Sequence, residues 1–301
     1  MNQILDTRLA DRTYQPSGAT SPIAYAVFLV IALLATPILG IVYAVIVWHN
    51  PIVYINAIGT GVFGAALGYL VYPVVKFGHV RSLKMERLFM VGFGLLGLYF
   101  SWAAHLSLAL NIVDSSSTLG SASFSLSDFF SLVIRPDVMM LYVLELARVG
   151  TWGFGSVPIN GTMLWVIWLI EAALVFALIF KINRKWSQYP YSEEDLSWGK
   201  KIKLKRTMSL HRGVTKFVEG IQDNNLSPLL EAPLGNRRAL EFTELVLYTF
   251  NRDNSCYGAF FNKTQERDNN GKHKSVYRKV SDFYKISSDQ KQEITDHFGV
   301  E

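Results

Sequence analysis

One stretch, Thr162–Ile182, most constrains what this chain can fold into. Its sequence, TMLWVIWLIEAALVFALIFKI, contains twelve Leu, Ile, Val and Phe residues and one carboxylate, Glu171. About 20 apolar residues in a helix cross the roughly 30 Å hydrocarbon core of a bilayer. The twelve side chains favour insertion by about 5 kcal/mol, which exceeds the cost of about 3 kcal/mol for one central acidic residue. The stretch is therefore predicted to span a membrane.

Three further apolar stretches are long enough to span, at residues 23–48, 52–75 and 88–112. The first is longer than a bilayer core requires, and Pro37 within it predicts a kink. Together with residues 162–182, these stretches predict an all-α bundle of four transmembrane helices over residues 22–183.

The loops between the spans set the orientation. Residues 76–87, KFGHVRSLKMER, carry four Lys and Arg, and further basic residues follow Lys181. Basic loops stay in the cytoplasm, so both termini are predicted to be cytoplasmic. Residues 1–21 then form a cytoplasmic tail, with a short helix over Gln3–Asp11.

The long connection at residues 113–161 is predicted to lie on the periplasmic side and to contain a helix. Pro136 suits the first helical position, Arg148 the last turn and Gly150 the C-terminal cap. Its apolar part is too short to span a bilayer. Two interpretations remain open: an interfacial or re-entrant helix packed on the bundle, or a helix of a separate periplasmic subdomain.

Residues 184–301 are predicted to form a small cytosolic α+β domain. The chain has a net charge of +5, and most of its Lys and Arg lie in this part. The lone Cys256 excludes a disulfide framework and suits a reducing compartment. Periodicity predicts an extended segment near residues 199–206, a helix at 212–224, a loop at 226–236, strands at 241–250, 257–264 and 275–286, and a last helix at 289–298 that Ser287 and Gln290 cap.

Several segments between residues 38 and 173 match a known pattern in order and spacing. They are PILGIVYAVIVWHNPIVYIN, KFGHVRS, SWAAHLSLALN and GTWGFGSVPINGTMLWVIWLIE, together with a glycine-rich second span. In these segments the chain resembles a family of bacterial polytopic membrane proteins that has no assigned activity. The resemblance implies the four-span fold and a bacterial inner membrane, and it brings no catalytic residues.

Two glycine patterns, Gly59-x-Gly61-x-x-Gly64 and Gly92-x-Gly94-x-x-Gly97, fit the dinucleotide-binding fingerprint. That fingerprint requires a strand, a tight turn and a helix N-terminus. Here both patterns lie inside apolar spans, where the helix already uses the backbone amides. No cofactor is therefore expected. Small residues that let helices approach closely explain the patterns better, and the predicted packing positions are Gly61, Gly64, Gly68, Gly94 and Gly97.

Glu171 is the most informative ionisable residue, because such groups in a span normally face the bundle interior. His105 on the third span lies at a similar depth and is its expected partner. The pair is interpreted either as a structural polar clamp or as a proton- or ion-responsive site. No set of histidines has metal-ligand spacing, and no base lies near Cys256 in the sequence, so neither a metal site nor a catalytic thiol is expected.

Basic residues cluster after the fourth span. Such juxtamembrane cations attract anionic lipid, and the few aromatic residues among them argue against nucleic acid as a partner. The cluster consists of Lys181, Arg184, Lys185, Lys201, Lys203 and Lys205.

These patterns favour an inner-membrane scaffold or sensor subunit that anchors a cytosolic interaction domain and binds a protein partner or a second copy of itself. The alternative is a channel, transporter or membrane-permeabilising effector that uses Glu171 and the glycine-rich spans. No motif supports a membrane enzyme.

Overall fold

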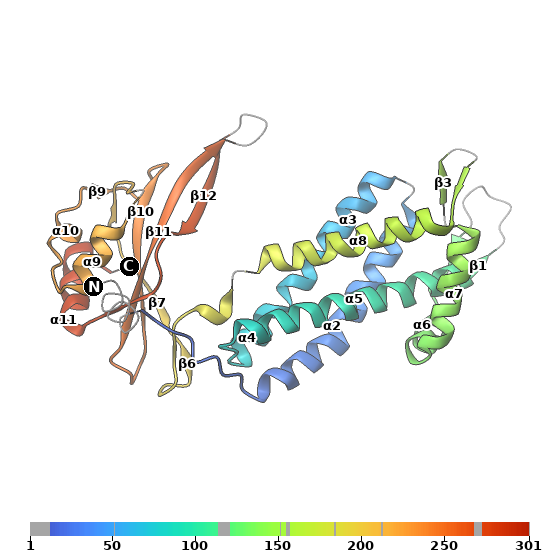
Figure 1. The fold of residues 1–301 in the computed structure, drawn as a ribbon, viewed down its shortest axis with the longest axis horizontal. Helices are drawn as coiled ribbons and strands as arrows, with labels where there is room; N and C mark the ends of the chain where they lie inside the picture. Colours follow the sequence, from blue (N-terminus) through green and yellow to red (C-terminus); the bar gives the residue numbers. More distant parts are fainter. Residues whose placement is uncertain are drawn as a thin grey trace, which may run out of the picture. The chain divides into compact units, whose positions relative to one another are not determined.

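The structure, a computed structural model, describes residues 13–50, 52–113, 121–150, 152–154, 157–183, 185–211, 213–267 and 273–300. The chain forms two compact units. Gly18–Ser187 form the first, and Gln188–Glu301 with the N-terminal segment up to Ser17 form the second (Figure 1). The expected helix at Gln3–Asp11 and the basic residue Arg184 lie outside the described residues.

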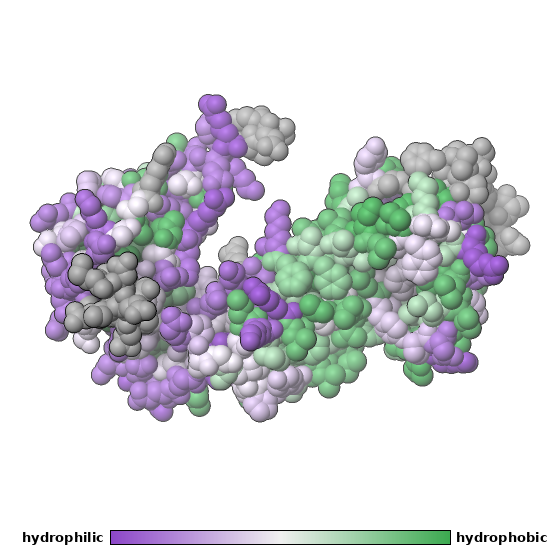
Figure 2. Space-filling view, viewed as in Figure 1, coloured by the Kyte–Doolittle hydropathy of each residue, from purple (hydrophilic) through white to green (hydrophobic). Residues whose placement is uncertain are grey.

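The first unit contains the predicted apolar helices. Within the described residues, four helical stretches are long and apolar enough to cross a membrane. They are built from α2 (Ile23–His49), α3 (Val53–Tyr69) with α4 (Val71–Phe77), α5 (Leu83–Leu110) and α8 (Gly161–Ile182). α2 packs chiefly against α5, and α3 chiefly against α8. The outward side chains are apolar, and Figure 2 shows a largely hydrophobic surface over these helices.

Two of the four stretches differ from their predicted form. The second is broken at Leu70, because Pro73 has no amide hydrogen for the carbonyl of Tyr69 and its ring crowds that turn. The third begins at Leu83 rather than Leu88, since the Ser82 side chain caps it by accepting a hydrogen bond from the Met85 amide at 3.5 Å. Part of the predicted basic loop is therefore helix.

The connection before α8 contains α6 (Leu126–Ile134) and α7 (Pro136–Val149). The helix that starts at Pro136 is confirmed, and α6 was not predicted. Phe129 and Leu132 of α6 and Val143 of α7 share one buried cluster with Phe100 and Ala104 of α5. The helices thus pack on the bundle and do not form a separate subdomain. Two short hairpins flank them: β1 (Ile112–Val113) with β2 (Ser121–Ala122), and β3 (Trp152–Phe154) with β4 (Val157–Ile159).

The second unit is an α+β domain with one antiparallel sheet. Its strands run in the order β12-β11-β10-β8-β9, with β13 also paired to β11 and β7 also paired to β10. The sheet consists of β7 (Lys200–Lys203), β8 (Thr207–Met208), β9 (Leu234–Gly235), β10 (Phe242–Thr249), β11 (Cys256–Arg267), β12 (His273–Lys279) and β13 (Tyr284–Ile286). Outside it, β5 (Tyr191–Ser192) and β6 (Ser197–Trp198) form a small hairpin.

Three helices, α9 (Thr215–Gln222), α10 (Ser227–Leu230) and α11 (Ser288–Phe298), cover one face of the sheet. The capping box of Ser287 and Gln290 at α11 is confirmed. Two expectations were wrong. The predicted loop 226–236 contains α10, which Pro228 favours as a residue of the first turn, and the predicted strand 275–286 is divided into β12 and β13.

The N-terminal segment is part of the second unit and not a separate tail. The Tyr14 amide donates to the Phe283 carbonyl at 2.8 Å, and its hydroxyl accepts from the Tyr191 amide at 3.2 Å. The Tyr14 ring meets the Tyr257 ring edge-on at 5.2 Å between centroids. The segment therefore covers one part of the sheet face that the helices leave open, beside Phe283 and Tyr189.

Candidate functional site

The carboxyl group of Glu171 lies on α8 and is half-buried. It interacts electrostatically with the Tyr43 hydroxyl of α2, which shares a 2.9 Å hydrogen bond with Thr60 of α3. Within the described part of the chain, Glu171 makes neither a hydrogen bond nor an ion pair. A carboxyl group in an apolar helix is thus left without a hydrogen-bonded partner among the described residues, and the hydroxyl with which it interacts electrostatically comes from α2.

His105, the predicted partner of Glu171, contacts aromatic rings instead. Its imidazole meets the rings of Trp48 and Trp102 edge-on, with centroids 5.1 and 5.9 Å apart. Trp102 in turn meets Trp168 of α8 at 4.6 Å. The structure does not join Glu171 and His105 by a hydrogen bond or an ion pair, because the indole rings occupy the space around the imidazole. The sequence pattern does not fix the direction in which each side chain leaves its helix.

The glycines lie where helices approach one another within the chain. A Cβ added to Gly64 would lie 2.8 Å from the Val175 carbonyl oxygen, and one added to Gly68 would lie 3.1 Å from the Ile179 Cα. At Gly61, Gly94 and Gly97 the added atom would meet only side chains, those of Leu178, Phe176 and Leu67. Gly40, which the sequence did not single out, makes the equivalent approach of α2 to α5, at 2.8 Å from the Ser101 amide nitrogen.

A buried carboxylate that the sequence did not single out, Glu86, is fully enclosed at the start of α5. One oxygen accepts from Asn183 Nδ2 at 2.8 Å and from the Trp186 amide at 3.0 Å. The other accepts from the Ser187 amide at 3.1 Å and from the Ser187 hydroxyl. Four donors on one carboxylate hold the segment that follows α8 against the beginning of α5. A single acid within a basic stretch was the available signal.

The segment that leads into α2 is attached to the same region. Thr20 pairs with Val80 in an isolated antiparallel bridge, and the Arg81 amide donates to the Ala19 carbonyl at 2.9 Å. We name this arrangement the exit clamp: residues 19, 20, 183, 186 and 187 bound to residues 80, 81 and 86. The segment before α2 and the segment after α8, which both lead to the α+β domain, therefore leave the bundle at the same end.

The predicted juxtamembrane basic residues fall in two places. Lys181 lies in the last turn of α8, and Lys185 follows it. Lys201 and Lys203 lie on β7 of the α+β domain, and Lys205 follows that strand. Tyr189 and Tyr191, which lie between these two groups in the sequence, pack inside the domain, against Phe283 and Trp198 respectively.

Cys256 is buried in the core of the α+β domain, where burial raises the pKa of its thiol to about 11. A thiol with such a pKa is protonated at neutral pH and is a poor nucleophile. In the described ranges, no three His, Cys, Asp or Glu residues group closely enough to hold a metal ion.

No protein-family model matches this chain, and the comparisons with curated proteins and with solved structures found no match either.

Proposed function

We propose that this chain is a polytopic membrane protein, a scaffold or sensor subunit, which holds its α+β domain at the membrane surface for a protein partner or a second copy of the chain. The exit clamp carries the proposal. It fixes both connections to the α+β domain at one end of the bundle, so the domain is attached at two points. Such attachment suits a domain that is to be held in place.

The outer surface of the bundle supports insertion in a membrane. Leu34, Ile58 and Leu169 are each about two thirds exposed, and many other large apolar side chains share this outer surface. Soluble proteins rarely expose contiguous apolar patches of this kind, whereas lipid covers them without cost. Four crossings return the chain to its starting side, which agrees with an N-terminal segment that completes the domain following α8. The bacterial inner membrane is our choice among membranes and rests on the family resemblance.

The glycine contacts favour a scaffold over a pore. The channel hypothesis needs the glycine-rich helices to line a pathway. Gly64 and Gly68 instead face the backbone of α8, and Gly94 and Gly97 face Phe176 and Leu67. These positions are used for packing inside the bundle. The half-buried carboxyl group of Glu171 is the one observation that favours the channel or transporter alternative.

Cysteine labelling tests the topology on which the proposal depends. Buried Cys256 allows single cysteines to be introduced at exposed Ser288 in α11 and exposed Asn160 before α8. In sealed, oriented membranes, an impermeant maleimide should label one of these positions from one side and the other only after permeabilisation. Labelling of both from the same side would refute four crossings.

Electrical recording separates the scaffold from the channel. The purified protein in planar bilayers should carry no selective current. A selective conductance that is lost in Glu171→Gln but kept in Glu145→Gln, an exposed control on α7, would replace the scaffold proposal by the alternative.

A further inference from the structure

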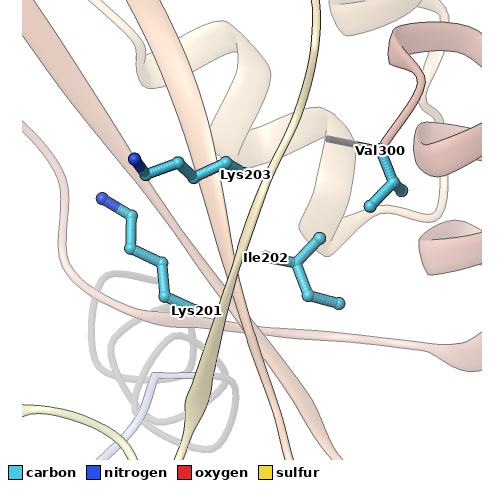
Figure 3. Close-up of a pocket in the computed structure, with 4 residues that line it drawn as sticks. All are labelled: Lys201, Ile202, Lys203 and Val300. Atoms are coloured by element: carbon cyan, nitrogen blue, oxygen red, sulfur yellow. The ribbon is translucent and has the colours of Figure 1, made fainter.

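The α+β domain presents a basic face that the sequence does not reveal. Residues paired across an antiparallel sheet point to the same side. The register pairs Val246 with Lys203 and Tyr248 with Lys201. It also pairs Lys263 with Tyr277. All of these side chains lie opposite the helices, and Figure 3 shows Lys201 and Lys203 on one side of β7 with Ile202 on the other. We name this surface the open face: Lys201, Lys203, Phe261, Lys263, Arg267, Ser275, Tyr277 and Lys279.

The charge of the open face is strongly positive. In the described parts of β7, β10, β11 and β12, Glu244 is the only carboxylate that points to this side. Its oxygens are occupied by Arg237 Nη2 at 3.0 Å and by the Tyr277 hydroxyl. Glu244 also interacts electrostatically with Lys201, but it is one carboxylate among four lysines of this face. Lys201 and Lys203 are exposed and form no salt bridge with a described residue.

Aromatic rings lie beneath the lysines and support them. The Lys201 ammonium lies 5.8 Å from the centre of the Phe261 ring, that of Lys263 lies 5.3 Å from Phe242, and that of Lys279 lies 4.3 Å from Phe283. Tyr277 stacks on Phe261 with centroids 5.2 Å apart and is 46% exposed. The quadrupole of a ring attracts a cation that lies over its face, so these rings help to position the ammonium groups. The face thus offers several ammonium groups around one exposed tyrosine, and the Lys263 ammonium also donates to the Ala239 carbonyl at 3.4 Å.

We propose that the open face binds the headgroups of anionic lipids in the bilayer that holds the bundle. This inference rests on the proposed membrane insertion. Only residues 18–22 separate the domain from α2, and only a few residues follow α8 before the domain begins. A domain joined by two short segments to membrane-spanning helices meets lipid headgroups at a high effective concentration. Lysines attract anionic lipid near a bilayer surface, and an exposed tyrosine suits the interface.

The composition of the face favours lipid over single-stranded nucleic acid. Nucleic-acid platforms stack successive bases on several exposed aromatic rings. Here Phe261 is buried under Tyr277, which leaves one exposed ring among the described residues of the face. Point-like ammonium charges on flexible stems suit a fluid layer of headgroups, whereas planar guanidinium groups suit the fixed geometry of a phosphate backbone.

Fluorescence quenching in nanodiscs tests the inference with the full chain. The Ser275→Cys variant, labelled with a fluorophore, places a reporter on the open face. Buried Cys256 stays unlabelled. The nanodiscs contain phosphatidylcholine alone or mixed with phosphatidylglycerol, plus a trace of lipid with a quencher in its headgroup. We expect stronger quenching with phosphatidylglycerol, and its loss as ionic strength rises, because screening weakens surface attraction.

Lysine substitutions decide whether the open face is responsible. Replacing Lys201, Lys203 and Lys263 by Gln should lower the equilibrium constant for surface binding by about 100-fold, at about fivefold for each lysine. The matched control replaces Lys216 on α9, Lys274 on the opposite side of β12 and Lys291 on α11. It removes the same charge and should leave quenching unchanged.

Three outcomes would overturn the inference. They are equal quenching in the two lipid mixtures, equal loss in both triple variants, and a reporter that responds to a single-stranded oligonucleotide but not to phosphatidylglycerol. Failure of the proposed membrane insertion would be visible separately, because the chain would not co-elute with the nanodiscs.

Discussion

Replacing Glu86 by Gln should release the segment that follows α8 from the bundle. The carboxylate is fully buried and accepts four hydrogen bonds, two at each oxygen. The substitution keeps the size of the side chain and one acceptor oxygen. It places an NH₂ group where the second oxygen faces the Ser187 amide and hydroxyl.

The magnitude follows from these bonds. A hydrogen bond to a charged group contributes about 1.5–3 kcal/mol. The Ser187 hydroxyl can turn and accept from the new NH₂ group, whereas the Ser187 amide cannot. One charged bond is thus lost and one buried donor is left unpaired, at a cost of about 2–3 kcal/mol. Because 1.4 kcal/mol is a factor of ten, local opening should become about 30- to 150-fold more frequent.

Hydrogen exchange in detergent micelles measures this opening. The amides of Trp186 and Ser187 should exchange faster in Glu86→Gln by that factor, while amides in the middle of α5 keep their rates. Glu145→Gln, at an exposed acid of α7, is the control and should change neither. An unchanged exchange rate at Ser187 in Glu86→Gln would show that the carboxylate does not hold the segment.

Three further predictions concern packing and burial. Gly64→Ala should destabilise the protein by about 1–3 kcal/mol, seen as a lower Tm in detergent, because the added Cβ would lie 2.8 Å from a backbone oxygen of α8. Gly61→Ala should have little effect, because its added Cβ would lie 3.4 Å from a side chain. Equal decreases in Tm for the two variants would contradict this reasoning. Cys256 should resist maleimide at neutral pH in the folded protein, and rapid labelling of the native state would refute its burial. Burial raises the pKa of its thiol from 9.0 to about 11. The contribution of the buried thiol to stability is therefore complete below pH 9 and is lost as the pH rises towards 11. Tyr14→Ala should destabilise the α+β domain by about 2 kcal/mol, as measured by the loss of its β-sheet circular dichroism on heating, whereas Gln15→Ala, at an exposed neighbour, should not.

The sequence predicted the bundle well because length and hydropathy are local properties. The helix from Gly161 begins within one residue of its predicted start, and the helix at Pro136 begins where proline favours it. The break at Leu70 was missed, although Pro73 is a local signal for it. The contacts of His105 were missed for another reason. Packing sets the rotation of each helix about its axis, so the hydrophobic pattern does not show that the Trp48 and Trp102 rings point towards the imidazole.

The open face could not be predicted for a similar reason. Lys201 and Phe261 are far apart in the sequence, and only the register of β10 with β7 and β11 brings them to one surface. Few aromatic residues lie close to these lysines in the sequence, whereas several lie close to them in the folded sheet. The burial of Glu86 was not predicted, because a single acidic residue in a basic loop is usually exposed to solvent, and its four hydrogen-bond donors come from a distant part of the sequence.

The exit clamp also has a consequence for how the α+β domain closes. Thr13 pairs with Tyr284, a contact that spans most of the chain, and bringing such distant segments together from a disordered state costs more entropy as the loop lengthens. Once the bundle has formed, residues 19, 20, 186 and 187 are already held at one short segment. The effective loop then shrinks to the few residues beyond the clamp on the N-terminal side and the domain itself on the other. The formed bundle thereby shortens the loop that the Thr13–Tyr284 pairing closes from about 270 residues to about 100, which lowers the entropic cost of closure by about 1 kcal/mol.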